Sequence, residues 1–397
     1  MTSYIRTLRP EIEKHLARGK SILLLGARQT GKTTLLSTFE FDLSFNLMDS
    51  ALRRRYEARP ETLGQELRAA YEKNNKILRV FIDEIQKVPE LLDNIQILID
   101  EKIAQFVLTG SSARKLRSPD INWLPGRIVK LQLDPLLISE IPKTELNLEK
   151  LLIYGQLPGI ISEPDEANKE IDLKSYVEIY LEEEIRIEAL VRNMGDFSRF
   201  LELAAAESGY LINMSKLSSD VGINQMMLQK FFQILEDCLI AKKIEPITET
   251  KTRRRLLQSN KFIIFDLGVR RIAAQEGPKL SMKLMGHLFE QFVGLQLINL
   301  LQQKAPEAKV KFWLDSNGLE IDWVIEYRGQ YLPIEVKWTD RPDRSMCKAC
   351  EIFISEYDCP VGGVIVCQTP MDMKLSEHVL GLSWKNLTDV CEKISKF

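Results

Sequence analysis

The sequence lacks three features that would each narrow its function. It has almost no net charge, because 54 lysines and arginines stand against 56 aspartates and glutamates. No stretch approaches the roughly 18 apolar residues that a membrane-spanning helix needs, and the charged N-terminal stretch is unlike a signal peptide. These absences exclude a long-range attraction to nucleic acid or anionic lipid. They predict a cytoplasmic protein with no membrane partner.

Cysteine is also scarce, since all six cysteines lie at or after Cys238. Four of them form a Cys-x-x-Cys pair followed by two single residues, at Cys347, Cys350, Cys359 and Cys367. Such a set could hold zinc or an iron–sulfur cluster. The spacings match neither site closely, however, and Cys367 ends the apolar run VGGVIVC, which is typical of a buried strand. We therefore expect buried thiols and no disulfides.

A chain of 397 residues is too long for one ordinary domain. Up to about residue 135, five apolar runs alternate with helical patterns, which predicts a parallel sheet covered on both faces. The runs are SILLLG, FDLSFNLMD, ILRVFIDE, QFVLTGS and RIVKLQLDP. We predict an α/β multidomain protein with a parallel-sheet core at 1–140, a mostly helical segment at 141–275 and a second α/β domain at 276–397.

The middle segment contains a helix-turn-helix pattern. MSKLSSDVGINQMMLQKFFQILEDCL predicts a helix, a turn at Val221-Gly222-Ile223 and a second helix that Asn224 caps. LIAKKIEPI and KFIIFDLG then predict two strands, with the basic stretch TETKTRRRLLQSN between them. A hairpin with a basic loop after a helix pair is typical of a winged helix.

A phosphate-binding loop follows the first predicted strand. Residues 26–33 match the P-loop pattern at every specified position, with a strand before them and a helix after them. Backbone N–H groups of such a loop surround nucleotide phosphates. Lys32 would neutralise phosphate oxygens during catalysis, and the Thr33 hydroxyl would ligate Mg²⁺. The predicted residues for binding ATP are Gly26, Ala27, Arg28, Gln29, Thr30, Gly31, Lys32, Thr33 and Thr34, with Ser111 from a later strand.

An acidic pair ends another buried strand, ILRVFIDE, about fifty residues after the loop. Asp83 would hold Mg²⁺ through water, as strand-end aspartates of P-loop enzymes do. Glu84 would orient and deprotonate the attacking water. The loop and the acidic pair together predict a parallel-sheet P-loop ATPase core that hydrolyses ATP with Mg²⁺.

Two further roles belong to such a site. Thr109, Ser111 and Ser112 follow the next strand, where a polar side chain could sense the γ-phosphate, although an ordinary serine-rich turn would look the same. An arginine should also neutralise the transferring phosphoryl group, from the same chain or from a neighbouring subunit, so oligomerisation stays open. The candidates are Arg127, which we prefer, Arg114 and Arg117.

The segments GARQTGKTTLL, VFIDEIQKVP, VLTGSSARKL, LPGRIVKLQLDPLLISE and YGQLPGI together resemble the ATPase core of AAA-type proteins of bacteria and archaea. The C-terminal domain of those proteins was long classed as of unknown function. The resemblance extends over nearly the whole chain, because the helical middle and the C-terminal strands follow in the family's order. It implies that the acidic strand lies beside the P-loop strand or one strand away, and it implies no particular biological task.

The last third carries a second set of acidic residues. Asp322 in EIDWVI and the pair Glu335 and Lys337 in IEVKW lie on successive predicted strands, after a helix that contains Glu290. This order resembles the PD-(D/E)XK nuclease superfamily, to which the family's C-terminal domain is similar. Glu290, Asp322 and Glu335 would bind Mg²⁺ or Mn²⁺, and Asp322, Glu335 and Lys337 would be catalytic. Glu-x-Lys is also a common solvent-facing alternation, and such folds persist without activity.

Basic residues surround the expected wing, and polar residues line the second helix before it. Such side chains can contact the phosphates and base edges of DNA, although they can equally be solvated. Two functions stay open: an ATP-driven enzyme that processes nucleic acid, with DNA favoured, and an ATP-controlled switch or scaffold that binds DNA or protein without cutting. The residues are Lys242, Lys243, Lys251, Arg253, Arg254 and Arg255 around the wing and Asn224, Gln225, Gln229, Lys230 and Gln233 on the helix.

Overall fold

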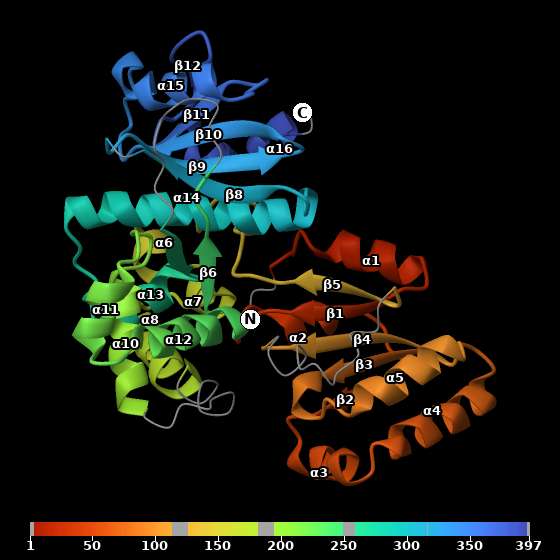
Figure 1. Cartoon of the computed structure of the whole chain (residues 1–397). Coiled ribbons are helices and arrows are strands. Elements are labelled where there is room, and N and C mark those ends of the chain that lie inside the picture. The colour runs from red at the N-terminus through yellow and green to blue at the C-terminus, as the bar shows by residue number, and fades with distance from the viewer. Residues whose placement is uncertain (1–3, 113–125, 182–193, 249–258, 316, 395–397) are drawn as a thin grey trace.

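The computed structural model describes residues 4–112, 126–181, 194–248, 259–315 and 317–394. These residues form a five-stranded sheet, a helical segment with a two-stranded sheet, and a six-stranded sheet. The long helix α14 (Met282–Lys304) lies between the six-stranded sheet and the rest of the molecule (Figure 1). Among the described residues, no helix is both long enough and apolar enough to span a membrane.

The first sheet is parallel throughout and has the strand order β2-β3-β4-β1-β5. All five strands lie where the sequence predicts them. The acidic strand β3 lies one strand away from the P-loop strand β1, with β4 between them. The strands are β1 (Ser21–Leu25), β2 (Leu43–Asn46), β3 (Leu78–Asp83), β4 (Ala104–Gly110) and β5 (Ile128–Gln132).

Helices cover both faces of this sheet, which explains why β1 is apolar at nearly every position. Leu23 and Leu25 pack on one side into the core shared with α3, α4 and α5. Ile22 and Leu24 point to the other side, where α1 and α2 cover the sheet. A strand buried on both faces loses the usual alternation of apolar and polar residues. The helices are α1 (Arg9–Ala17), α2 (Lys32–Leu36), α3 (Ser50–Ala58), α4 (Glu61–Asn74) and α5 (Leu91–Asp100).

The helical segment builds its own core from aromatic and aliphatic side chains. Helices α11 (Met214–Val221) and α12 (Gln225–Asp237) are joined at Gly222, whose φ of 82° ends α11. The Asn224 side chain accepts a hydrogen bond from Met227 N, so the predicted cap of α12 is confirmed. The antiparallel strands β6 (Ala241–Ile244) and β7 (Lys261–Ile264) follow. The assignment of these elements as a winged helix stays a prediction.

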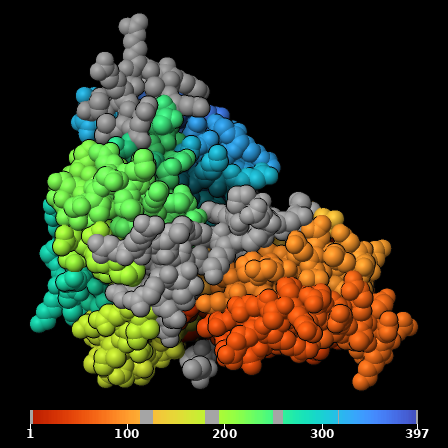
Figure 2. All heavy atoms as spheres, turned by 60° about the horizontal axis from the view of Figure 1, so that its bottom comes forward, coloured from red at the N-terminus to blue at the C-terminus, as the bar shows by residue number. Residues whose placement is uncertain are grey.

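The other α-helices described in this segment contribute to the same core. They are α6 (Leu148–Tyr154), α7 (Pro158–Ser162), α8 (Glu166–Ser175), α10 (Met194–Ala206) and α13 (Leu267–Ala273). The space-filling view shows the segment, in green, beside the surface of the first sheet and its helices, in orange (Figure 2). One polar contact between the two parts runs from Ser112 Oγ to the Asp237 carbonyl, at 3.4 Å.

The last third forms a mixed sheet of order β12-β13-β11-β10-β9-β8. Strands β8, β9 and β10 are antiparallel neighbours, whereas β10, β11 and β13 run parallel. Helix α14 covers one face and α15 the other. The assignment of this domain to the PD-(D/E)XK fold stays a prediction. The elements are β8 (Lys309–Leu314), β9 (Glu320–Tyr327), β10 (Gln330–Val336), α15 (Lys348–Glu356), β11 (Gly363–Cys367), β12 (Met373–Lys374), β13 (Val379–Ser383) and α16 (Asp389–Ile394).

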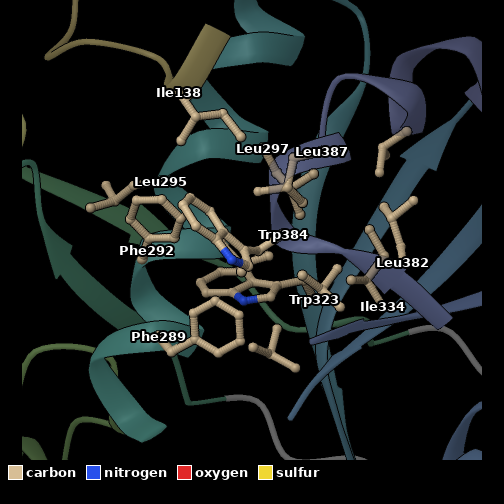
Figure 3. Close-up of a cluster of buried hydrophobic side chains, with 14 of the residues drawn as sticks. Ile138, Phe289, Phe292, Leu295, Leu297, Trp323, Ile334, Leu382, Trp384 and Leu387 are labelled. Carbon is tan, nitrogen blue, oxygen red and sulfur yellow. The ribbon is translucent and has the colours of Figure 1, made fainter. Parts of the chain in front are cut away.

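Helix α14 approaches this sheet closely at one glycine. A Cβ atom at Gly294 would lie 2.1 Å from the Trp323 ring, so a larger residue would push the helix off the sheet. Phe289 and Phe292 of α14 surround the same indole together with Trp384 (Figure 3). This aromatic packing fixes the position of α14, and with it the position of Glu290 beside the strands that carry the other acidic residues.

A buried arginine near the N-terminus connects the phosphate loop to the segment after β5. Arg6 donates hydrogen bonds to the carbonyls of Thr30 and Asp134, both at 2.6 Å. Its Nε lies 3.0 Å from Glu140 Oε2, and both side chains are at least 95% buried. Glu140 also accepts a hydrogen bond from the Thr7 backbone N–H, at 2.7 Å. The loop backbone is therefore held by a fully desolvated ion pair.

We expect Arg6→Ala to destabilise the chain by roughly 3–5 kcal/mol, because it leaves the buried Glu140 carboxylate without its cation. Urea denaturation followed by circular dichroism would measure the change in the free energy of unfolding. The matched control is Arg53→Ala, which removes an exposed pair with Glu57 and should cost well under about 1 kcal/mol. Equal stability of the two variants would contradict a structural role for Arg6.

Candidate functional site

The phosphate loop turns sharply between β1 and α2. Gly31 has a φ of 91°, and a Cβ atom at Gly26 would lie 2.3 Å from the Leu133 carbonyl oxygen, so both positions require glycine. Lys32 is buried, and its Nζ donates to the carbonyls of Gly26 and Ala27 at 2.8 and 3.0 Å. The lysine side chain thus lies against the phosphate loop. We expect it to contact the phosphates of a nucleotide bound there.

The acidic strand meets the loop through one carboxylate. Asp83 accepts a hydrogen bond from the Thr33 hydroxyl at 3.1 Å and another from the Thr109 hydroxyl. Thr109 in turn accepts one from the Glu84 backbone N–H at 3.0 Å. The carboxyl ends of β1, β3 and β4 lie at one edge of a parallel sheet, which brings the three segments together. The structure thus places the two predicted Mg²⁺ residues, Thr33 and Asp83, in direct contact.

Glu84 is held beside this carboxylate in an uncommon backbone conformation, with a φ of 61°. Its Oε2 accepts a hydrogen bond from Ser111 Oγ at 3.0 Å and one from Gln86 Nε2. Gln86 is buried and also donates to Ser111, at 2.9 Å. The predicted residue Ser111 is therefore at the site, where it contacts the carboxylate. Gln86 escaped the sequence analysis, because an isolated glutamine after an acidic pair carries no recognisable pattern.

Two more residues reach the loop from outside the sheet and also escaped the sequence analysis. The Arg6 guanidinium binds the Thr30 carbonyl, and the Tyr176 hydroxyl donates to the Arg28 carbonyl at 3.3 Å. Both contacts join residues more than twenty positions apart, so no local motif could reveal them. Tyr176 belongs to the helical segment, which therefore contacts the nucleotide loop directly.

The predicted arginine is not brought to this loop within its own chain. The Arg127 carbonyl accepts a hydrogen bond from the N–H of Ser21, which begins β1, whereas the phosphate loop follows the end of that strand. Its guanidinium pairs with Asp100, with Nε 2.5 Å from Oδ1. Arg127 thus lies at the opposite edge of the sheet. Ser112, predicted as a possible phosphate sensor, instead contacts Asp237. The alternatives Arg114 and Arg117 lie outside the described residues.

A second polar cluster forms where α14 meets β9 and β10. One ligand atom from each of Glu290, Glu320 and Asp322 can lie within 4.8 Å of the others, and this is the one group of metal-capable side chains found within the described ranges. Asp322 also accepts a hydrogen bond from Val336 N at 2.7 Å. Glu335 is 97% buried and receives Lys337 Nζ at 2.5 Å. The predicted metal ligands Glu290 and Asp322 thus lie together with Glu320, whereas Glu335, predicted as the third ligand, is not in this group and pairs with Lys337.

Two residues of this cluster were missed by the sequence analysis. Glu320 precedes Asp322 by two positions on β9, so strand alternation could have indicated it. Lys261 comes from β7 of the helical segment and carries no such signal. Its Nζ lies 2.6 Å from Glu320 and 3.4 Å from Glu290, with only 4% of its side chain exposed.

The electrostatics of the cluster follow from crowded charge in a desolvated place. Burial raises the pKa of Asp322 well above its usual value, and repulsion from Glu290 and Glu335 adds to the rise. Burial likewise raises the pKa of Glu335, although Lys337 opposes it. Burial also works against ionisation of Glu290, but His287 and the Lys261 ammonium together hold its pKa below the usual value. A cation bound among these carboxylates would therefore reduce the repulsion between their negative charges.

The four-cysteine alternative is not formed. Cys347 directly precedes α15 and Cys350 lies on it, both packed in the apolar core between α15 and the sheet, and Cys367 is buried in β11 as the sequence predicts. All six cysteines are free thiols. Burial raises the pKa of the Cys359 thiol to about 12.

The expected DNA-binding surface is present only in part. On α12, the predicted polar face is exposed, at Asn224, Gln225, Gln229, Lys230 and Gln233. Lys242, in contrast, is largely buried and pairs with Asp134 at 3.0 Å, while Lys243 pairs with Glu245 at 3.2 Å. Lys242 therefore serves an internal contact, contrary to the expectation that it faces phosphate. The remaining wing cations, Lys251, Arg253, Arg254 and Arg255, lie outside the described residues.

Comparison with protein-family models gives three consecutive matches. An AAA domain matches residues 18–142, a domain of unknown function (DUF8612) matches 145–279, and a second one (DUF4143) matches 285–387. The first match contains the phosphate loop, Asp83 and Glu84. This part of the chain is thus similar to AAA-type ATPase domains, and the match supports binding and hydrolysis of ATP, usually with Mg²⁺.

Two relatives cover most of the chain. An uncharacterized protein of Mycobacterium bovis and one of Mycobacterium tuberculosis are each 22% identical in an alignment of 390 residues that covers 92% of this chain and 83% of theirs.

Solved structures give weaker similarity. The Pif1 helicase of Candida albicans is 12% identical, with a TM-score of 0.23 over 45% of this chain and 48% of its own. PCH-2 of C. elegans is 14% identical, with a TM-score of 0.28 over 60% and 70%. A STAND-class signal transduction ATPase of Pyrococcus horikoshii is 13% identical, with a TM-score of 0.23 over 76% and 47%. Similarity this low supports no conclusion about function.

Proposed function

We propose that this chain hydrolyses ATP at the phosphate loop and acts on nucleic acid, DNA in particular, through its C-terminal domain. The observation that carries the ATPase half is the set of contacts among Thr33, Asp83 and Thr109 at the carboxyl edge of the sheet. These contacts join the loop that would hold the phosphates to the strand that would hold the metal and the catalytic base. ATP hydrolysis requires both at one place.

The side chains present suit Mg²⁺, which favours hard oxygen donors. The Thr33 hydroxyl and the Asp83 carboxylate, 3.1 Å apart, would hold it, and the ion would neutralise charge on the β- and γ-phosphates. Lys32 would turn from the loop carbonyls to phosphate oxygens. Glu84 would orient the attacking water and take its proton. Because Arg127 is paired with Asp100 at the far edge, it would serve only the site of a neighbouring copy.

Replacing Lys32 with alanine should weaken ATP binding by a factor of about 10 to 100. The lysine would contribute a hydrogen bond between opposite charges, worth roughly 1.5–3 kcal/mol, and 1.4 kcal/mol corresponds to a factor of ten. Calorimetric titration with ATP and Mg²⁺ would measure the dissociation constant. Lys73→Ala, on the exposed surface of α4, is the control and should bind like the wild type. Equal affinities in both variants would remove Lys32 from the site.

The nucleic-acid half of the proposal rests on the cluster at α14, β9 and β10. Its carboxylates could hold Mg²⁺ or Mn²⁺, a metal that would supply Lewis-acid polarisation of a phosphodiester. Lys337, whose Nζ donates a hydrogen bond to Glu335, could stabilise the charge that develops on a phosphate oxygen. The exposed polar face of α12 could contact the same nucleic acid.

The full chain should be incubated with single-stranded, duplex and branched DNA and with RNA, with Mg²⁺ or Mn²⁺, and with or without ATP. The proposal expects metal-dependent cleavage of at least one DNA substrate. Binding of nucleic acid without cleavage under all of these conditions would instead support the second candidate function. That candidate is an ATP-controlled switch or scaffold whose C-terminal domain binds DNA or protein. Lys261 favours it, because an ammonium already neutralises the carboxylates that a metal would need.

A further inference from the structure

Lys261 reaches the C-terminal carboxylates from a different part of the chain. It is the first residue of β7, where it pairs with Ile244 of β6, and its backbone also forms a bridge with Leu211. The side chain then leaves the helical segment and enters the cluster at α14 and β9. A lysine this deeply buried is rare unless its charge is compensated, since desolvating an isolated ammonium is costly.

The compensation for Lys261 comes from two metal-capable carboxylates. Its Nζ donates to Glu320 at 2.6 Å and lies 3.4 Å from Glu290. The ammonium also lies 4.9 Å from the centre of the Phe312 ring, which closes the cluster on another side. The third member, Asp322, is hydrogen-bonded to Val336 N. The charge that a divalent ion would bring is therefore already supplied in part by the lysine.

Lys261 takes up one oxygen, Oε1, of each of Glu290 and Glu320. A divalent cation bound by the same carboxylates would compete with the ammonium for these groups, and two neighbouring cations in a desolvated place would repel each other strongly. The donor set thus suits a metal, but the arrangement in this structure suits an ammonium.

We propose that Lys261 is the resident cation of the cluster of Glu290, Glu320 and Asp322, and that Lys261 and a divalent metal ion exclude one another there. The inference rests on the metal site of the proposed function, and it adds that Lys261 regulates the access of metal to that site. Metal enters only when β7 draws Lys261 out of the cluster. The site is therefore closed in the conformation described here and opens through movement of the β6–β7 hairpin.

The hairpin is well placed to transmit such a movement. Lys242 on β6 pairs with Asp134 beside the ATPase sheet and donates to Asn299 of α14, at 2.8 Å. Asp134 also binds Arg6, which holds the phosphate loop. In sequence, Lys261 follows directly after the basic stretch expected to contact DNA. Nucleotide bound at the loop, or DNA bound at the hairpin, could each favour the open state over the closed one. The size of the shift equals the difference between that ligand's binding free energies for the open and the closed state.

The first test is calorimetric titration of the full chain with Mn²⁺ in the absence of nucleotide. Lys261→Met should bind Mn²⁺ at least about tenfold more tightly than the wild type, because the metal no longer has to break hydrogen bonds between charged groups. Adding Asp322→Ala should abolish that gain. Lys309→Met, at an exposed position of β8 outside the cluster, should match the wild type. Equal affinity of Lys261→Met and wild type would overturn the exclusion.

A second measurement uses the unmodified protein and does not depend on the variant folding. Amine acetylation followed by mass spectrometry should label Lys261 poorly without metal and several-fold faster once Mn²⁺ is added, while labelling of the exposed Lys309 stays constant. Unchanged protection of Lys261 at Mn²⁺ concentrations that saturate the cluster would also overturn the proposal.

These readouts separate two kinds of failure. They measure metal binding and lysine exposure, so absence of DNA cleavage would count against the proposed function and leave the exclusion standing. Circular dichroism would show whether Lys261→Met is folded. If the folded variant does not bind Mn²⁺ through Asp322, both the metal site and the exclusion are overturned.

Discussion

Glu84→Gln is expected to slow ATP hydrolysis by a factor of about 10² to 10⁴ while leaving ATP binding nearly unchanged. The glutamine has the shape of the glutamate but cannot accept a proton from water. It can still accept hydrogen bonds through its amide oxygen, so the contacts with Ser111 and Gln86 can be kept. The change therefore isolates the chemical role of the carboxylate from its structural role.

Phosphate release under saturating ATP and Mg²⁺ would give the turnover number of each Glu84 variant, and calorimetry would give its affinity for ATP. The control is Glu90→Gln, an exposed acidic residue that precedes α5, which should turn over like the wild type. If Glu84→Gln hydrolysed ATP at the wild-type rate, another group would have to act as the base, and the assignment of the acidic pair would fail.

Asp322→Ala is expected to reduce metal-dependent cleavage of nucleic acid by a factor on the order of 10³ or more. Loss of a central carboxylate removes metal ligation, and a catalytic metal contributes several kcal/mol to lowering the barrier. Glu335→Ala should behave similarly. Lys337→Met should abolish cleavage but leave Mn²⁺ binding largely intact, because an ammonium does not coordinate a metal. This split between cleavage and binding distinguishes a catalytic lysine from a merely structural one.

ATP hydrolysis provides the internal control for these C-terminal variants. The phosphate loop and the carboxylate cluster belong to different sheets, so Asp322→Ala and Lys337→Met should both retain wild-type ATPase rates. Glu377→Ala, an exposed acidic residue of the same domain, should cleave like the wild type. Cleavage that persisted unchanged in Asp322→Ala would assign the activity to some other part of the molecule.

Much of this architecture could be predicted because its signals are local. The five strands of the first sheet are continuous apolar runs, since both faces are covered, and Asn224 precedes α12 with the residue type that helix caps prefer. Asp83 and Glu84 could be predicted because the acidic pair lies about fifty residues after the phosphate loop, although an acidic pair at a strand end is a weak signal alone.

The remaining features depend on contacts between distant segments. Arg6, Gln86 and Lys261 each act on residues brought close only by tertiary packing, and one sequence gives no periodicity or spacing that would show this. Arg127 illustrates the converse problem. Its segment fits the resemblance to the AAA-type core, yet the residue directly precedes β5 and so lies at the amino edge of a parallel sheet. Position along a strand decides which edge a side chain can serve.

Steady-state phosphate release by the purified full chain with ATP tests ATP hydrolysis most directly. We expect turnover that requires Mg²⁺ and stops on addition of EDTA. At subsaturating ATP, Lys32→Ala should turn over more slowly, by the same factor as its loss of ATP affinity. Excess Mg²⁺ should restore the rate after chelation. A folded chain that binds ATP and Mg²⁺ but releases no phosphate above the buffer rate, with or without DNA, would contradict the proposal that this chain hydrolyses ATP.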